Sequence, residues 1–135
     1  MCSFLCGDGV PTASDAIDAC FSEPDVPYIL SKLDADASPF CTDAAAAIRR
    51  GSPTAAAVTL EAVRRARGAK LDDVLRTDFR VMTNMVRPGV MSEDFYEGVR
   101  AALVDKDRSP AWRPVAIDVE AYFEAPDGAF EELVL

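Results

Sequence analysis

Basic side chains gather in one part of an otherwise acidic sequence. Between Arg49 and Lys70 there are six bases and one acid, whereas the whole chain carries a net charge of −9. Lys and Arg are the side chains that bind phosphate groups, so this island indicates a site for a phosphorylated ligand. The alternative is a solvated helix surface, because basic residues are common near the C-terminal ends of helices. The six bases are Arg49, Arg50, Arg64, Arg65, Arg67 and Lys70.

The residue types indicate no catalytic set and no metal site. The chain contains no histidine, which excludes Ser-His-Asp and Cys-His catalysis and zinc sites bound through histidine. Its 23 acidic residues show no spacing that selects a general acid–base pair. The cysteines do not form the close pairs of a four-cysteine zinc site, and we expect free thiols. They are Cys2, Cys6, Cys20 and Cys41.

Composition narrows the class of protein. A chain of 135 residues that is 50% hydrophobic and 27% charged fits one soluble globular domain over residues 1–135. No apolar run approaches the ~20 residues of a membrane-spanning helix, so we expect no membrane contact. The acidic balance argues against nucleic acid as a partner. The first 24 residues hold four acids and no base, unlike a transit peptide, and they lack a secretory signal.

Helix caps and apolar periodicity predict an all-α fold with no strand. Ser52 and Pro53 can start a helix that ends at Gly68, since Ser caps free amides and Pro suits the first helical position. The next helix, over residues 71–86, shows the clearest periodicity. Its apolar residues, at spacings of three and four, are Leu71, Leu75, Phe79, Met82 and Val86.

Shorter helices are expected on either side of this pair. Three precede this pair. The first is capped by Thr12 or Ser14 and holds Ile17, Cys20 and Phe21, the second starts at Asp25, and the third runs from Thr42 to Arg50. One follows over residues 92–104, and residues 105–135 form an extended tail with short helices, one of them over residues 118–123. Residues 1–11 are expected to fray. The buried face of the helix after Ser92 would be Phe95, Val99, Ala102 and Leu103.

The most distinctive stretch is residues 92–114. It reads Ser-Glu-Asp-Phe-Tyr-Glu-Gly-Val-Arg-Ala-Ala-Leu-Val-Asp-Lys-Asp, followed by Arg-Ser-Pro-Ala-Trp-Arg-Pro. This resembles the C-terminal signature of 3-hydroxyisobutyryl-CoA hydrolases, a branch of the enoyl-CoA hydratase/isomerase (crotonase) superfamily. Residues 52–54 and 78–80 resemble the helices that precede the signature there. The resemblance covers about residues 17–135.

The resemblance implies the all-α C-terminal helical subdomain of a crotonase-superfamily enzyme, without the β-β-α spiral core. In the family that core supplies the oxyanion hole and the acidic residues that activate water, so no residue here inherits a catalytic role. The implied parent activity is hydrolysis of the 3-hydroxyisobutyryl-CoA thioester in valine catabolism, with no metal and no redox cofactor. Coenzyme A is part of the substrate. We expect the chain alone to be inactive.

The implied partners are acyl-CoA and a crotonase-type core, carried on the same parent chain or on a separate one. Lys106 matches the lysine of the family's Asp/Glu-Lys pattern, which lies near the nucleotide end of CoA, and is the first candidate for a phosphate contact. Arg64, Arg65 and Arg67 are further candidates. We expect Trp112 to anchor the tail on the helices. The family is cytoplasmic or lies in the mitochondrial matrix, and a thin core favours a homo-oligomer.

Two alternatives stay open at this point. The chain can be a non-catalytic CoA-binding or assembly module that pairs with a separate crotonase-type core. It can also be a helical interaction domain unrelated to CoA, which residues 92–114 argue against.

Overall fold

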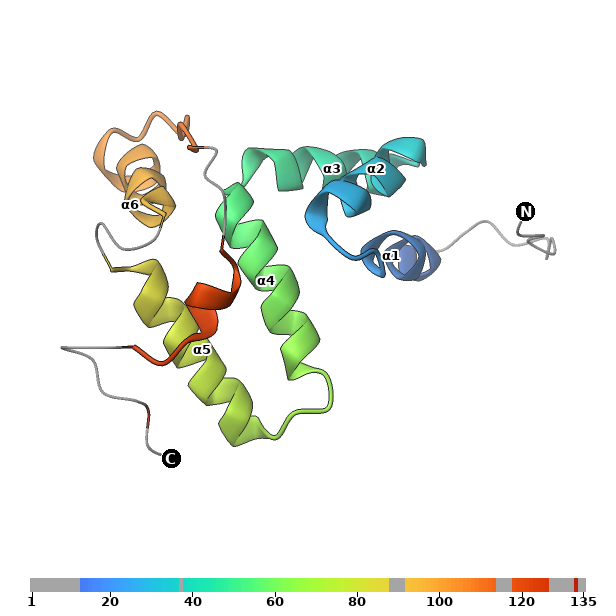
Figure 1. Cartoon of the computed structure of the whole chain (residues 1–135). Helices are drawn as coiled ribbons and strands as arrows, with labels where there is room; N and C mark the ends of the chain where they lie inside the picture. Colours follow the sequence, from blue (N-terminus) through green and yellow to red (C-terminus); the bar gives the residue numbers. More distant parts are fainter. Residues whose placement is uncertain (1–12, 37, 88–91, 114–117, 127–132, 134–135) are drawn as a thin grey trace. The chain divides into compact units, whose positions relative to one another are not determined.

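The computed structural model describes the chain except for residues 1–12, 37, 88–91, 114–117, 127–132 and 134–135. The described residues form helices, turns and loops and no strand, so the all-α prediction is confirmed (Figure 1). The chain divides into two compact units, Met1–Ala47 and Ile48–Leu135. Each unit is compact by itself, and the single domain over residues 1–135 stays a prediction. The fraying of residues 1–11 concerns a part of the chain outside the described residues.

The first unit contains α1 (Ala13–Phe21), α2 (Val26–Ala35) and most of α3 (Pro39–Arg50). Asp25 caps α2 as predicted, because its carboxylate accepts the Tyr28 N–H at 2.9 Å. Cys20 and Cys41 are free thiols, which confirms that prediction for the two cysteines that are described. Both are buried, and burial of Cys20, beside the thiol of Cys41, raises the pKa of its own thiol. The side chains that fill this unit are Cys20, Ile29, Leu33, Cys41 and Ala45.

The start of α3 was predicted too late in the sequence. The helix begins at Pro39 and not at Thr42. Ser38 provides the cap, since its hydroxyl accepts the Cys41 N–H at 3.3 Å. A proline at the first helical position completes the same Ser-Pro start signal that was recognised at Ser52.

The second unit contains α4 (Pro53–Ala66), α5 (Leu71–Met85), α6 (Asp94–Val99), the π-helix η1 (Arg100–Val104) and the 3-10 helix η2 (Glu120–Phe123). Ser52 caps α4 as predicted, accepting the Ala55 N–H at 3.0 Å. Gly68 follows α4 with a φ of 77°, a conformation that glycine adopts without strain, and lets the chain turn into α5. Figure 1 shows α4 and α5 side by side, with η2 against α5.

The core of the second unit forms where η2 meets the two long helices. Val58, Tyr122 and Phe123 are buried there. The side chain of Asn84, 2% exposed, holds η2 by donating to the carbonyls of Tyr122 and Glu124, both at 3.1 Å. A segment predicted as tail is therefore part of the core. The half-buried residues around it are Ala62, Val81, Met85 and Val119.

The predicted buried face of the helix after Ser92 is wrong. Leu103 is 68% exposed and Phe95 is 47% exposed, whereas Asp94 and Ala101 are buried. On α5, likewise, Met82 of the periodic apolar set is 70% exposed. The physical reason is that η2 packs on the side of α5 that bears Val81, Asn84 and Met85. No described residue of this chain buries Met82, Phe95 or Leu103. Such exposed apolar surface is typical of an interaction site.

Candidate functional site

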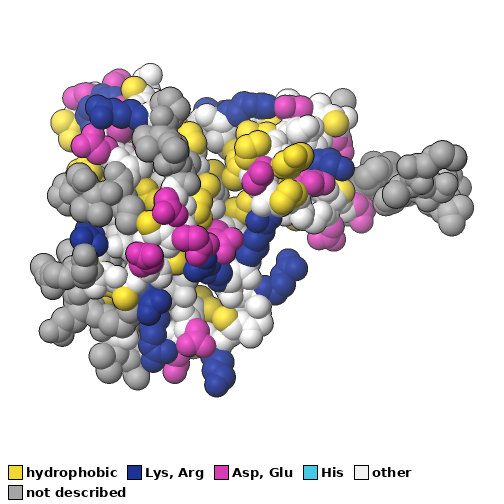
Figure 2. Space-filling view, viewed as in Figure 1, with side chains coloured by type: hydrophobic (Ala, Val, Ile, Leu, Met, Phe, Trp, Pro, Cys, Tyr) yellow, Lys and Arg dark blue, Asp and Glu magenta, His cyan; other side chains and the backbone are white. Residues whose placement is uncertain are grey.

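The predicted phosphate-binding cations all lie in the second unit, in different settings. Arg65 is engaged within the chain: it donates to Glu61 at 2.7 Å and to both carboxylate oxygens of Glu120 at 2.6 Å, and its guanidinium lies 4.0 Å from the centre of the Phe123 ring. Arg64 also has a partner. Arg67 ends α4 and is exposed. Figure 2 shows acidic side chains beside basic ones on the face in view.

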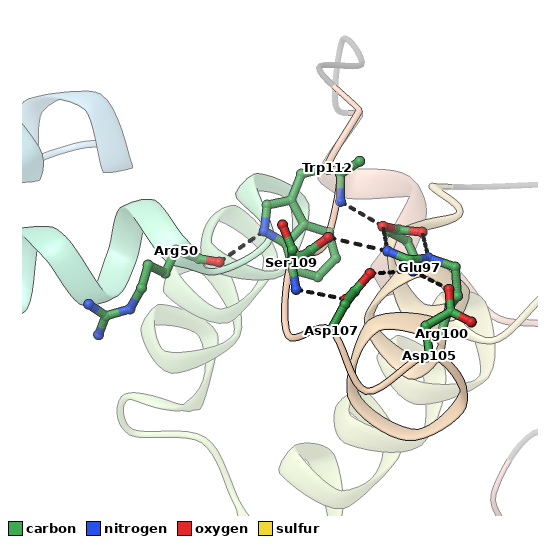
Figure 3. Close-up of polar contacts among 8 residues, drawn as sticks. Arg50, Glu97, Arg100, Asp105, Asp107, Ser109 and Trp112 are labelled. Atoms are coloured by element: carbon green, nitrogen blue, oxygen red, sulfur yellow. Dashed lines mark hydrogen bonds and ion pairs between the residues drawn. The ribbon is translucent and has the colours of Figure 1, made fainter.

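Lys106 lies on a turn organised by Arg100, the first residue of η1. The Arg100 guanidinium donates to both oxygens of Glu97, at 2.8 and 2.9 Å, to Asp107 at 2.9 Å, and to Asp105 (Figure 3). It also donates to the Ser109 carbonyl at 3.2 Å. One side chain thus binds the end of α6 to both ends of the turn that contains Lys106.

Backbone bonds fix the conformation of the turn. The Asp105 N–H donates to the Arg100 carbonyl at 2.9 Å, which closes the π-turn, and the Arg108 N–H donates to the Ala101 carbonyl at 3.0 Å. Lys106 and Arg108 have φ values of 58° and 54°. Long side chains rarely adopt this left-handed region, and such strain persists only where the surrounding structure holds it. Strained positions of this kind gather at functional sites.

The ion pairs make the turn sensitive to acid. The hydrogen bonds from Arg100, and then from the Ala111 N–H at 2.6 Å, lower the pKa of Glu97 to about 2. The pKa of Asp107 is also lowered, first by the Ser109 N–H and then by Arg100. A carboxyl group with a depressed pKa in the folded chain stabilises the fold above its unfolded pKa, about 4.3 for Glu, and the contribution is lost as the pH falls towards the folded value.

We therefore expect the turn to open between about pH 4 and about pH 2. The chain has one tryptophan, Trp112, next to Ala111, so its fluorescence reports the transition. In Glu97→Gln the step should become smaller, because one of the two titrating groups with a lowered pKa is gone and Asp107 remains. An unchanged acid step in Glu97→Gln would show that another carboxyl group controls the turn.

Trp112 anchors the segment after the turn, as the sequence predicted. Its indole N–H donates at 2.9 Å to the carbonyl of Arg50, which is the last residue of α3 (Figure 3). The bond gives a partner to a carbonyl that the helix end leaves without one. Its ring lies over Gly98 so closely that a Cβ there would be 3.3 Å from the ring. Glycine at this position is what permits the contact, which is with the indole ring and not with another helix.

We expect Gly98→Val to lower the free energy of unfolding by about 2 kcal/mol, because overfilling a packed contact costs about 1–3 kcal/mol. Helix propensity alone predicts the opposite sign, since valine is a better helix former than glycine. The Trp112 emission should shift to longer wavelength as the ring is displaced into water. Ala102→Val, one turn further on at an exposed position, is the matched control and should change neither quantity. Equal effects of the two variants would contradict the Gly98–Trp112 contact.

Trp112 and Gly98 also line a cavity of about 520 Å³. Its wall is mainly apolar and includes Phe95, Val99 and Leu103. One polar edge is formed by Ser52, whose hydroxyl donates to the buried Asp94 carboxylate at 2.5 Å. The other lining residues are Thr54, Ala55, Met85, Ser92, Ala102 and Tyr122.

The polar groups of this cavity are engaged in holding the helices. Asp94 receives the Ser52 hydroxyl and the Ser92 N–H donates to the Tyr122 hydroxyl at 3.1 Å. These bonds join the starts of α4 and α6 to η2. The cavity therefore offers an apolar surface with a rim whose described polar groups are bonded to one another and to helix starts.

Arg100, which organises the site, was not among the residues predicted from the sequence. Its signal was present: an acid three residues before it, and acids five and seven residues after it. Spacing of three on a helix brings side chains together, but the contacts with Asp105 and Asp107 depend on the turn that follows η1.

The described residues include no group of His, Cys, Asp and Glu that could hold a metal ion. They also include no helix long and apolar enough to cross a membrane.

Comparison with known proteins identifies the class. The model of the enoyl-CoA hydratase/isomerase family matches residues 8–122, and the chain belongs to this family. Among curated proteins it is similar to the mitochondrial 3-hydroxyisobutyryl-CoA hydrolase of Gallus gallus, with 39% identity over 88% of this chain and 30% of the relative. The 3-hydroxyisobutyryl-CoA hydrolase-like protein 5 of Arabidopsis thaliana is 35% identical over 82% of this chain and 30% of the relative.

Solved structures give the same family with other reactions in their names. A carnitinyl-CoA dehydratase from Mycobacterium thermoresistibile matches with a TM-score of 0.72 and 36% identity, over 88% of this chain and 36% of that one. An enoyl-CoA hydratase from Rhodobacter sphaeroides matches with a TM-score of 0.70 and 32% identity, over 89% and 38%. The chain thus spans about 30% of the length of these curated relatives. The resemblance predicted from residues 92–114 is confirmed at the level of the family.

Proposed function

We propose that this chain supplies the C-terminal helical segment of a CoA thioester hydrolase that acts on 3-hydroxyisobutyryl-CoA in valine catabolism. The two curated relatives carry that hydrolase name, while the two solved structures are named as a dehydratase and a hydratase of CoA esters. CoA is what these names share, and the reaction is what differs. A segment common to all of them is suited to handling CoA, with the chemistry supplied by the rest of the protein.

The observation that carries the proposal is the exposure of Lys106 on a turn that is held in place. Its neighbours Asp105 and Asp107 are bound by Arg100, so they are not paired with the lysine. Lys106 is exposed and forms no ion pair with any described residue. The pyrophosphate and 3′-phosphate of CoA call for such a cation, and we assign Lys106 to them.

Of the three arginine candidates, Arg67 is the best placed for a second contact. It is exposed where α4 ends, whereas Arg65 binds Glu61 and Glu120 and stacks over Phe123. A phosphate contact by Arg65 would compete with these bonds, which hold η2. Arg64 has a contact of its own within the chain.

The apolar cavity supports the second half of the proposal, a partner that covers it. We propose that this partner is a crotonase-type core, from the same parent chain or a separate one, and that the helices lie over the acyl-CoA site. The chain alone is then inactive, with no metal or redox cofactor required and CoA as part of the substrate. Subunit contacts in a homo-oligomer are expected at the same surface. We propose a setting in the cytoplasm or the mitochondrial matrix; the name of the Gallus gallus relative describes that protein as mitochondrial.

The contact of Lys106 with CoA is tested by kinetics. The chain is combined with the part of the Gallus gallus relative that it does not match, expressed separately as the core. Lys106→Asn is the variant, since asparagine tolerates a left-handed backbone. We expect KM for 3-hydroxyisobutyryl-CoA to rise about tenfold with kcat nearly unchanged, because a contact remote from the thioester binds ground state and transition state alike.

Lys32→Ala, which removes the same charge from an exposed side chain of α2, is the control and should leave KM unchanged. A KM for Lys106→Asn equal to that of the unmodified chain would remove the lysine from the site. A fall in kcat alone would place it near the reacting thioester and contradict the assignment to phosphate.

A further inference from the structure

We propose that Arg108 joins Lys106 in binding phosphate, and that Arg100 is the positioning residue that keeps both cations available. This inference rests on the proposed function and extends it: the ligand group is a phosphate of a nucleotide, and two residues are added to its site.

The first observation is the order of charges in the turn. Residues 105–108 alternate acid and base, an arrangement in which neighbouring side chains ordinarily neutralise one another. Here both acids bind Arg100, with Asp107 at 2.9 Å from its guanidinium. Lys106 and Arg108 are exposed, and neither forms an ion pair with another residue in the described part of the chain. Arg100 therefore separates the two acids from the two bases.

The second observation is the backbone of the same two residues. Lys106 and Arg108 are the non-glycine residues with positive φ in the described chain, at 58° and 54°. Neither residue type favours this conformation by itself. The bonds of Arg100 and the Arg108 N–H bond to the Ala101 carbonyl at 3.0 Å hold it. The left-handed backbone occurs at the two exposed cations and not at Asp107, which lies between them. This placement indicates that the exposure of the two cations is functional.

The chemistry of the two cations determines which ligand groups they can bind. Lys offers a compact ammonium and Arg a planar fork of donors, and together they can bind different oxygens of one phosphate or of two linked phosphates. The remaining acid near the turn, Glu97 of α6, is held by both Arg100 and the Ala111 N–H. Its charge is thus directed to the protein and does not compete for the turn's exposed cations.

The test measures binding of adenosine 3′,5′-bisphosphate to the full chain by NMR, with the amide signals of residues 105–109 as the readout. Arg108→Asn, which suits a left-handed backbone, should weaken binding about fivefold, as expected for one charge-assisted contact at an exposed site. Arg100→Gln should weaken it by a similar factor although Arg100 does not touch the ligand, because the freed acids then pair with the two cations. Lys32→Ala should change nothing.

A further variant separates charge from structure. Adding Asp105→Asn and Asp107→Asn to Arg100→Gln removes the competing acids, and we expect the lost affinity to return. If it does not return, Arg100 acts by holding the backbone of the turn and not by keeping the two acids from the two cations, and the inference that it separates the charges is overturned. Unchanged affinity in Arg108→Asn, or signal changes away from residues 105–109, would overturn the two-cation site.

The proposed function and this inference can be contradicted independently of each other. If the bisphosphate binds at the turn but the chain combined with a crotonase-type core releases no CoA from 3-hydroxyisobutyryl-CoA, the phosphate site stands and the hydrolase assignment falls. If hydrolysis occurs and Arg108→Asn leaves binding unchanged, the hydrolase assignment stands and this inference falls.

Discussion

Leu103→Glu is expected to weaken association with a crotonase-type core by about tenfold or more while leaving the isolated chain as stable as before. Leu103 lines the cavity and is 68% exposed in this chain, so a charge there meets water and costs little. In the complex the same position would be covered. Burial of a leucine contributes about 1.5–3 kcal/mol, and a buried unpaired carboxylate adds a further penalty.

The matched control is Val63→Glu. Val63 is 64% exposed on α4 and does not line the cavity. Co-elution on a sizing column and titration calorimetry give the affinity, and urea unfolding gives the stability. Equal losses of affinity in the two variants would indicate a general charge effect. No loss in Leu103→Glu would mean that the cavity is not the docking surface.

Asn84→Asp is expected to lower the free energy of unfolding by about 3 kcal/mol at pH 7, since the carbonyls of Tyr122 and Glu124 lose their donor and face a carboxylate. The amide of Asn84 donates to Tyr122 and Glu124 at 3.1 Å each, and its side chain is buried. Loss of these bonds releases η2, which carries Tyr122 and Phe123 of the core. The sequence gives no indication of such a role, because an asparagine within a helix is ordinarily exposed.

The effect of Asn84→Asp should depend on pH with a known sign. A carboxyl group facing carbonyls has a raised pKa in the folded chain, so the penalty is present above that pKa and decreases as the pH falls and the protonated acid donates again. Thr59→Asp adds the same charge at an exposed position of α4 and is the control in urea unfolding. A loss of equal size in both variants, or no recovery on acidification, would contradict the role of Asn84.

The local parts of the fold could be predicted because their causes are local. Ser52 with Pro53, Asp25 and Gly68 each act within one turn of a helix, and the structure places helix ends at these residues. The start of α3 was predicted at Thr42, although Ser38 and Pro39 form the same start signal and the helix begins at Pro39. These elements need only caps and propensities, which a sequence displays directly.

The long-range contacts could not be predicted in the same way. The docking of η2 depends on Asn84 and Arg65, which are separated from it by about 40 and 55 residues. Exposed Leu103 and Met82 were misjudged for a related reason: periodicity shows that a helix has an apolar side, and says nothing of whether this chain covers it. The family resemblance has a third source, because it depends on the complete motif of residues 92–114 and not on single caps or on periodicity.

The central claim is that this chain completes a crotonase-type core to give a CoA thioester hydrolase. The most direct measurement is release of CoA from 3-hydroxyisobutyryl-CoA, followed by chromatography, for the chain, for the core of the Gallus gallus relative, and for the two together. We predict no release above the uncatalysed rate from the chain alone, little from the core alone, and enzymatic turnover from the mixture. Turnover by the chain alone, or a core whose activity the chain does not change, would contradict the claim.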